Sequence, residues 1–246
     1  MVEPLFNNPD FTRFYDAENP WDTDKDYCLA MARDVGSVLD LGCGTGELAT
    51  RLADGRRVTG VEPAAAMLDH ARRRQGAGQV RWVEADARSV RLNETFDLVV
   101  MTGHAFQCLL TKDDQQALCA TIAAHLAPGG TFIFDSRNPA VEEWRQWTPD
   151  QSRRMLDVPD LGDFETWNDV RFDQDSAIAA YDTVYCDQKT GQTWQATSRI
   201  LFADQPQIAE VIASAGLKPL RWMGDWIGGP MTATSPEIIP VGGLAG

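Results

Sequence analysis

The feature that most constrains the fold is the stretch 37–50, which reads S-V-L-D-L-G-C-G-T-G-E-L-A-T. Its apolar run 38–41 predicts a buried strand. The run ends in three glycines at alternate positions, Gly42, Gly44 and Gly46, and helix-forming residues follow at once. Glycine permits a tight turn with no Cβ in the way of a ligand, and the free N–H groups of the following helix face the same place. The stretch therefore predicts an α/β fold with a ligand site at the tip of its first strand.

The spacing of these glycines separates two classes of ligand. Dinucleotide-binding folds favour G-x-G-x-x-G, in which the third glycine comes three positions after the second. Here it comes two positions after the second, and Glu47 stands where that glycine is expected. A carboxylate would repel a pyrophosphate, so a cationic ligand fits better. The motif D-L-G-C-G-T-G resembles motif I of the class I S-adenosylmethionine-dependent methyltransferases. The alternative is a glycine-rich turn that binds no ligand.

The resemblance to this family extends from residue 37 to about residue 139, and the last strands match it loosely. L-A-P-G-G before the predicted strand 131–134 is similar to the family pattern. The resemblance implies a Rossmann-like, doubly wound sheet of seven strands, mostly parallel, with an antiparallel C-terminal hairpin. It also implies S-adenosylmethionine as the cofactor and direct displacement of its methyl group by a nucleophile of the substrate. Such a reaction depends mainly on positioning.

A carboxylate at the end of the second predicted strand supports an adenosine-containing ligand. The run 57–61 reads as a strand, and Glu62 follows it 22 positions after Asp40. An acid about 20 residues on accepts hydrogen bonds from ribose hydroxyls. The same feature suits NAD, and a solvated strand-end glutamate is the plain alternative.

The resemblance also implies which residues contact the cofactor. An acid after the third predicted strand, 80–84, would bind the adenine amino group, and Asp86 matches it; a turn or cap residue is the alternative. The carboxylates of Asp40 and Asp86 would offset the sulfonium charge. The full set of expected cofactor contacts is Asp40, Gly42, Cys43, Gly44, Gly46, Glu62, Pro63, Met67, Asp86, Ala87 and Thr102.

Candidate substrate contacts follow the fourth and fifth predicted strands. Strand 96–101 is followed by T-G-H-A-F-Q, at the carboxyl edge of the sheet where ligands bind in open α/β folds. His104 is the one histidine at a predicted strand end, and imidazole has a suitable pKa for a catalytic base. A loop histidine can equally make only structural hydrogen bonds. Phe106, Arg137 and Asn138 are further candidates, although the last two can simply hold the turn.

The segment 1–36 is an aromatic arm with a predicted helix over 24–33. Its aromatic side chains either pack on the sheet or form a lid that excludes water from the site. In related methyltransferases the equivalent arm often covers cofactor and substrate. Tyr15, Trp21 and Tyr27 are therefore candidate substrate contacts.

The α/β alternation stops between residues 140 and 202. Runs 164–173, 177–187 and 192–202 alternate as antiparallel strands do. We interpret this segment as an inserted β cap on the catalytic side of the cofactor-binding core 37–139. Its four tryptophans either form a small core or cage a cation. The segment 203–246 predicts a closing helix over 204–215 and strands over 217–226 and 237–241.

Composition excludes several classes of protein. The chain has 246 residues and a net charge of −14, which disfavours a nucleic-acid partner because phosphates would be repelled. We expect no signal peptide, because the N-terminus lacks basic and apolar regions, and no membrane span, because no apolar run approaches the length of about 20 residues that a span needs. We expect no metal, because the five cysteines and three histidines show no zinc-like spacing. Free thiols indicate a cytoplasmic protein. A small-molecule substrate is expected; both a monomer and a homodimer fit.

The sequence leaves the acceptor atom, N or O, undecided. No N-P-P-Y or D-P-P-Y run follows the fourth predicted strand, in contrast to the amino-methylating DNA enzymes that the family includes. An NAD-dependent oxidoreductase, a non-catalytic S-adenosylmethionine-binding protein and a protein methyltransferase are the alternatives.

Overall fold

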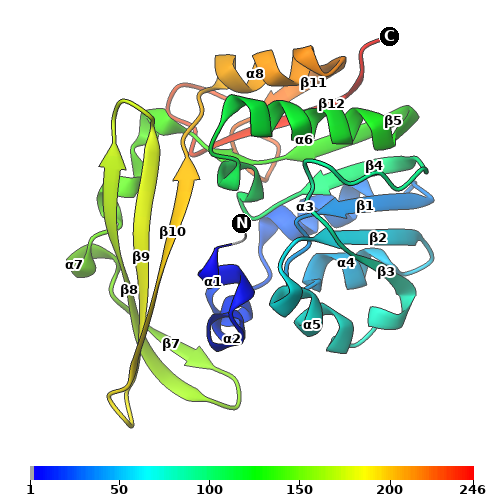
Figure 1. The fold of residues 1–246 in the computed structure, drawn as a ribbon. Helices are drawn as coiled ribbons and strands as arrows, with labels where there is room; N and C mark the ends of the chain where they lie inside the picture. Colours follow the sequence, from blue (N-terminus) through cyan, green and yellow to red (C-terminus); the bar gives the residue numbers. More distant parts are fainter. Residues whose placement is uncertain (1–2) are drawn as a thin grey trace.

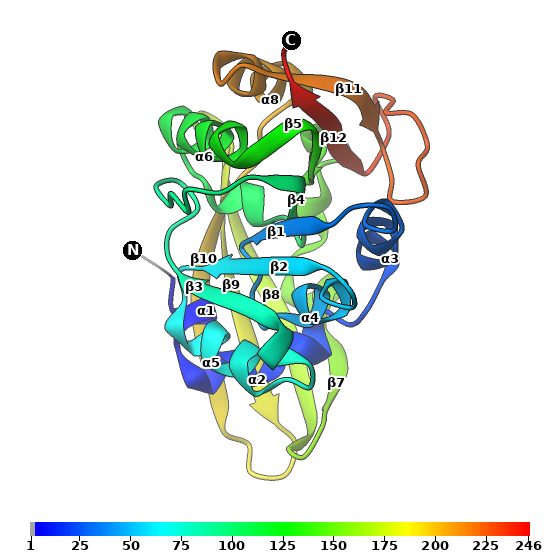
Figure 2. The same cartoon turned by 90° about the vertical axis from the view of Figure 1, so that its right-hand side faces the viewer.

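A mixed sheet carries the site, and a separate antiparallel sheet faces it (Figures 1 and 2). The computed structural model describes residues 3–246. In the large sheet the strand order is β11-β12-β5-β4-β1-β2-β3. The central strands are parallel, β12 runs antiparallel to β5, and β11 antiparallel to β12. The predicted doubly wound sheet of seven strands with an antiparallel hairpin is therefore confirmed. The bounds are β1 Ser37–Leu41, β2 Arg57–Glu62, β3 Val80–Glu84, β4 Phe96–Met101, β5 Leu126–Phe134, β11 Leu217–Met223 and β12 Glu237–Leu244.

The region around β5 differs from the prediction. β5 begins at Leu126 rather than at residue 131, because the A-P-G-G segment stays extended and Leu126 pairs with Phe96 of β4. A further strand of two residues, β6 (Ser136–Arg137), pairs with the start of β12. β6 therefore connects the end of β5 to the last strand of the chain.

Helices cover both faces of the large sheet (Figure 2). On one face lie α3 (Thr23–Met31) and α4 (Glu47–Leu52), and on the other α6 (Lys112–His125) and α8 (Gln205–Ser214). Successive strand residues point to opposite faces, so both faces of the central strands are apolar. Val38 packs with the α4 side chains, whereas Leu39 packs with those of α6 and α8. α5 (Ala65–Arg73) packs on β3.

The inserted segment forms the second sheet, with the order β10-β9-β8-β7. Three of its strands were predicted, and β7 was not. A stacked pair, Trp144 on Phe172 with centroids 4.0 Å apart, builds a small core with Phe202 rather than a cation cage. The elements are η3 Pro139–Val141, η4 Glu143–Gln146, α7 Pro149–Ser152, β7 Arg154–Val158, β8 Gly162–Asp173, β9 Ile178–Asp187 and β10 Thr193–Leu201.

The N-terminal arm lies between the two sheets (Figure 1). It contains α1 (Pro4–Asn7) and α2 (Pro9–Glu18) in addition to α3. Phe14 is fully buried and stacks on Tyr185 of β9 at 4.0 Å between centroids. The arm is therefore packed against the inserted sheet. Two short helices, η1 (Ala77–Gln79) and η2 (Ala105–Cys108), complete the fold. Within residues 3–246, no helix has the length and apolar character needed to cross a membrane.

Candidate functional site

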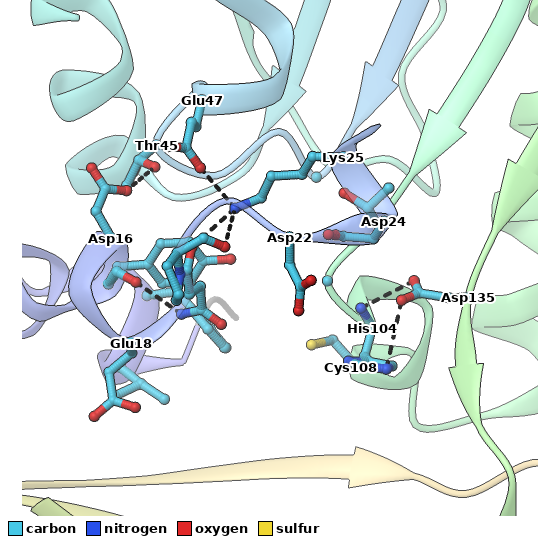
Figure 3. A pocket seen from close by; sticks show the side chains of 18 of the residues that line it. Asp16, Glu18, Asp22, Asp24, Lys25, Thr45, Glu47, His104, Cys108 and Asp135 are labelled. Atoms are coloured by element: carbon cyan, nitrogen blue, oxygen red, sulfur yellow. Dashed lines mark hydrogen bonds and ion pairs between the residues drawn. The ribbon is translucent and has the colours of Figure 1, made fainter. Parts of the chain in front are cut away.

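A cavity of about 590 Å³ opens where the carboxyl ends of the parallel strands, the arm and the inserted sheet meet. Figure 3 shows its acidic lining, with Asp22 and Asp24 from the arm, Glu47 from the glycine turn and Asp135 from the end of β5. Eight carboxyl side chains but only three Lys or Arg side chains line this cavity, counted over residues 3–246. The field inside it therefore favours a cation.

The glycine turn gives the cavity one wall of bare backbone. Gly42 lines the cavity with a φ of 72°, and a Cβ there would lie 3.2 Å from Ala105. Gly44 has a φ of 53°, and the ring of Tyr15 lies directly above it, 3.6 Å from where a Cβ would stand. Glycine is required here because other residues rarely adopt this left-handed conformation. Gly46 has another role, since a Cβ there would come within 2.5 Å of Trp82.

Asp40 is the most informative side chain of this wall. It lines the cavity with 2% of its surface exposed, and its Oδ2 has no hydrogen-bond partner within residues 3–246. Burial, and then the nearby Glu62, raise the pKa of Asp40 to about 7. An unpaired buried carboxyl is costly unless a ligand supplies a donor or a positive charge. The residues present therefore fit S-adenosylmethionine, which carries a sulfonium and an ammonium.

Glu62 lies behind the turn and does not line the cavity. Its carboxylate accepts hydrogen bonds from the N–H groups of Gly44 (3.0 Å) and Ala64 (2.9 Å). Burial raises the pKa of Glu62, and these two hydrogen bonds act in the opposite direction. In this structure Glu62 fixes the shape of the glycine turn.

Replacement of Glu62 by Ala should weaken S-adenosylmethionine binding by about 1–3 kcal/mol. The substitution removes the hydrogen bond from the Gly44 N–H, and it also removes the predicted contact with the ribose hydroxyls. Titration calorimetry measures the effect. Glu84→Ala, at the end of the neighbouring strand β3, is the control and should bind normally. Unchanged affinity of Glu62→Ala would contradict this role.

Several predicted cofactor residues lie outside the cavity lining. Asp86 accepts hydrogen bonds from the Arg88 side chain, which lowers the pKa of Asp86. Met67 and Ala87 are buried. Pro63 precedes helix α5, which starts at Ala65. Of the predicted set, the cavity brings together Asp40, Gly42, Cys43 and Thr102; it does not include Gly44, Gly46, Glu62, Pro63, Met67, Asp86 and Ala87.

Only some of the predicted substrate residues line the cavity. Tyr15, His104 and Arg137 line the cavity. Trp21, Tyr27, Phe106 and Asn138 do not line the cavity. Trp21 Nε1 donates to Asp26 at 2.8 Å, and Tyr27 packs on Trp226. Phe106 is fully buried and stacks on Phe134, and the Asn138 amide donates to the carbonyls of Ala233 and Ser235. These four residues stabilise the walls and turns around the cavity.

His104 lies at the centre of a cluster that the sequence revealed only in part. The backbone N–H of His104 donates to Asp135 Oδ1 at 3.1 Å, and the imidazole Nε2 lies 3.0 Å from Glu237 Oε1. Burial and then Arg137 lower the pKa of His104 to about 4, whereas burial raises the pKa of Asp135 to about 6 and that of Glu237 to about 8. Glu237 was not predicted as a site residue. One signal in the sequence was available: Glu237 begins a predicted antiparallel strand. The start of an antiparallel strand lies at the same edge of the sheet as the carboxyl ends of the parallel strands.

Polar contacts attach the arm to the glycine turn (Figure 3). Lys25 Nζ donates to Glu47 Oε2 at 2.7 Å, and also to two backbone carbonyls of the arm. Thr45 Oγ1 donates to Asp16 at 2.6 Å, and Arg74 also pairs with Asp16. These contacts hold the arm against the glycine turn.

Comparison with known proteins agrees with this geometry. The family model of a methyltransferase domain matches residues 38–130. A cypemycin N-terminal methyltransferase from Streptomyces sp is 38% identical over 108 residues, 44% of each chain. A dTDP-4-amino-2,3,4,6-tetradeoxy-D-glucose N,N-dimethyltransferase from Saccharopolyspora spinosa is 30% identical, over 58% of this chain and 57% of that protein. The matches therefore span about half the length of these curated relatives.

Solved structures share the whole fold. The CcbJ methyltransferase from Streptomyces caelestis superposes with a TM-score of 0.78 at 22% identity, over 95% of this chain and 96% of that one. The sheet order and the glycine-turn cavity define a Rossmann-like methyltransferase fold. The family-model match over residues 38–130 and the shared fold both agree with the predicted class I S-adenosylmethionine-dependent methyltransferase family.

Proposed function

We propose that the protein is an enzyme that transfers a methyl group from S-adenosylmethionine to a nitrogen or oxygen atom of a small molecule by direct displacement. The observation that carries this proposal is the single cavity, which joins the bare glycine turn beside Asp40 to the His104 cluster. Two relatives are N,N-dimethyltransferases of dTDP-linked amino sugars, which supports a small-molecule acceptor.

Asp40, Gly42, Cys43 and Thr102 would hold the cofactor, with Glu62 fixing the turn behind them. When bound, S-adenosylmethionine supplies an activated methyl group, whose bond to sulfur breaks with the electron pair left on sulfur. The protein's part is to hold donor carbon and acceptor atom in line, which can lower the barrier by ~7–11 kcal/mol.

The arm and the inserted sheet would exclude water from this reaction. Tyr15 lies above Gly44, and the Lys25–Glu47 ion pair joins arm and turn. We assign 1–36 as the lid, 37–139 as the cofactor-binding core, 140–202 as the cap and 203–246 as the closing segment of one methyltransferase domain. His104 is the proposed base, because it lies at the carboxyl edge of β4 and its lowered pKa of about 4 keeps its imidazole unprotonated at neutral pH.

We infer that nucleic acid is not a partner, because the acidic chain and the acidic cavity would repel phosphates. A cytoplasmic location fits the five cysteines, each of which is a free thiol.

Calorimetric titration with S-adenosylmethionine and with NAD tests the cofactor, and we expect a single site for the former and no heat for the latter. Mass spectrometry of small amines and phenols incubated with protein and S-adenosylmethionine then tests transfer. Methylated product supports the enzyme. Tight binding with no product across the panel favours a non-catalytic binder, and binding of NAD instead favours an oxidoreductase.

A further inference from the structure

Resting on the proposed methyl transfer, we propose that the acceptor is a basic amine, which binds as its ammonium ion to the cluster of His104, Asp135 and Glu237. We call these three side chains the acceptor cluster. They come from three separate places in the chain, following β4, following β5 and starting β12. One ligand atom of each lies within 4.8 Å of the other two. The topology therefore converges them on one point of the cavity.

An unpaired oxygen in this cluster calls for a donor. Asp135 is only 1% exposed. Its Oδ1 accepts a hydrogen bond from the backbone N–H of His104, but no hydrogen bond from residues 3–246 reaches its Oδ2. Asp135 lines the cavity, and Oδ2 lies 3.6 Å from His104 Nε2. A carboxylate oxygen that lines a cavity and has no donor from the protein is free to accept a hydrogen bond from a ligand. An ammonium offers three N–H donors, whereas a neutral hydroxyl offers one.

The charges around the acceptor cluster also favour binding of an ammonium ion. The negative charges of Asp24 in α3 and Glu143 in η4 raise the pKa values of His104 and Glu237. Arg137 is a cation that acts on His104 and Glu237, but its Nε lies 3.2 Å from Glu143 and its Nη1 donates to Gln107 at 3.0 Å. The charge of Arg137 is therefore largely paired, and the acceptor cluster remains negative overall.

The acceptor cluster also gives the amine a route to its reactive form. An ammonium has no lone pair, so one N–H proton must leave while its electron pair stays on nitrogen. Glu237 as a carboxylate can take this proton, directly or through His104 Nε2, 3.0 Å away. The free lone pair then forms the bond to the methyl carbon as the carbon–sulfur pair goes to sulfur. Burial raises the pKa of Glu237 to about 8, which suits a group that exchanges protons with an amine near neutral pH.

Benzylamine and benzyl alcohol provide a matched pair of probes, since they share shape and differ in charge at neutral pH. Each is titrated at pH 7 into protein saturated with S-adenosylhomocysteine and followed by saturation-transfer NMR. We expect benzylamine to bind about 10- to 100-fold more tightly than the alcohol, as for hydrogen bonds to charged groups. Asp135→Asn should reduce this preference at least about tenfold. Glu237→Gln should reduce it as well, because a bound ammonium ion stabilises the carboxylate form of Glu237. Their affinity for S-adenosylhomocysteine should stay at the wild-type value.

The control variant is Glu210→Gln on the exposed face of α8, which should keep the full preference for the amine. The proposal is overturned if the amine binds no better than the alcohol, if neither binds, or if the preference survives in both acceptor-cluster variants. A divalent metal ion that binds this cluster and displaces benzylamine would also overturn it. The binding of S-adenosylhomocysteine itself is measured separately, and the benzylamine and benzyl alcohol titrations are repeated without it. If S-adenosylhomocysteine does not bind, the proposed function is contradicted, whereas the amine preference is tested independently by the repeated titrations.

Discussion

Gly44→Val is expected to weaken S-adenosylmethionine binding at least about 100-fold while leaving the protein folded. Gly44 has a φ of 53°, and a Cβ there would stand 3.6 Å from the Tyr15 ring. The two methyl groups of valine would have to displace Tyr15, and a side chain in the left-handed region costs about 1–2 kcal/mol in addition. Both changes distort the backbone wall of the cavity. Calorimetry measures the affinity, and circular dichroism with thermal unfolding checks the fold.

A second glycine provides the matched control for backbone strain. Gly55 also has a positive φ, 72°, but a Cβ there would meet nothing within 4 Å. Gly55→Val should therefore lose stability by a similar amount and bind S-adenosylmethionine normally. Normal affinity in Gly44→Val, or an equal loss of affinity in Gly55→Val, would contradict the assigned pocket.

Asp40→Asn is expected to gain stability over the wild-type protein as the pH rises, by about 2–3 kcal/mol between pH 5 and pH 8 without ligand. Burial raises the pKa of Asp40 to about 7, above its value in the unfolded chain. Below the unfolded value both states are protonated, and the burial costs nothing. As the pH rises toward 7, the unfolded state ionises first, so the free energy of unfolding of the wild type falls. Asparagine cannot ionise and escapes this loss. Urea unfolding at each pH measures the difference.

The same substitution should weaken S-adenosylmethionine binding about tenfold or more, because a carboxylate beside a cationic ligand is lost. Stability and binding thus change in opposite directions, as expected of a residue kept for function. Asp69→Asn, an exposed position on α5, should change neither. A stability difference that does not vary with pH would contradict the burial of an ionisable Asp40, and unchanged binding would contradict its place in the cofactor site.

Local patterns predicted the parts of the molecule that depend on local chemistry. The glycines after β1 and the apolar runs of β1 and β4 define the sheet because both faces of these strands are covered. Asp204 and Gly216 bound helix α8 as expected, through a capping box and a φ of 71°. Each of these signals lies within a few residues of the structure that it specifies.

Features that depend on distant partners were missed or misplaced. Helix α2 is held by burial of Phe14 against Tyr185, a residue 171 positions further along the chain. Trp21 and Tyr27 have the aromatic character of pocket residues, but that character serves packing equally well. Glu237 reaches His104 only because β12 pairs antiparallel with β5, which brings its first residue to the functional edge. The predicted strand 237–241 is a signal for the position of Glu237 at this edge, but nothing near Glu237 in the sequence indicates that His104 is its partner.

A crystal structure with S-adenosylhomocysteine bound is the most direct test of the central claim, that the cofactor lies against the main chain at the tip of β1. We predict density for the ligand in the 590 Å³ cavity, in contact with Gly42 and Cys43 and close to Asp40. Density at another place, or a pyridine nucleotide in this cavity, would contradict the account.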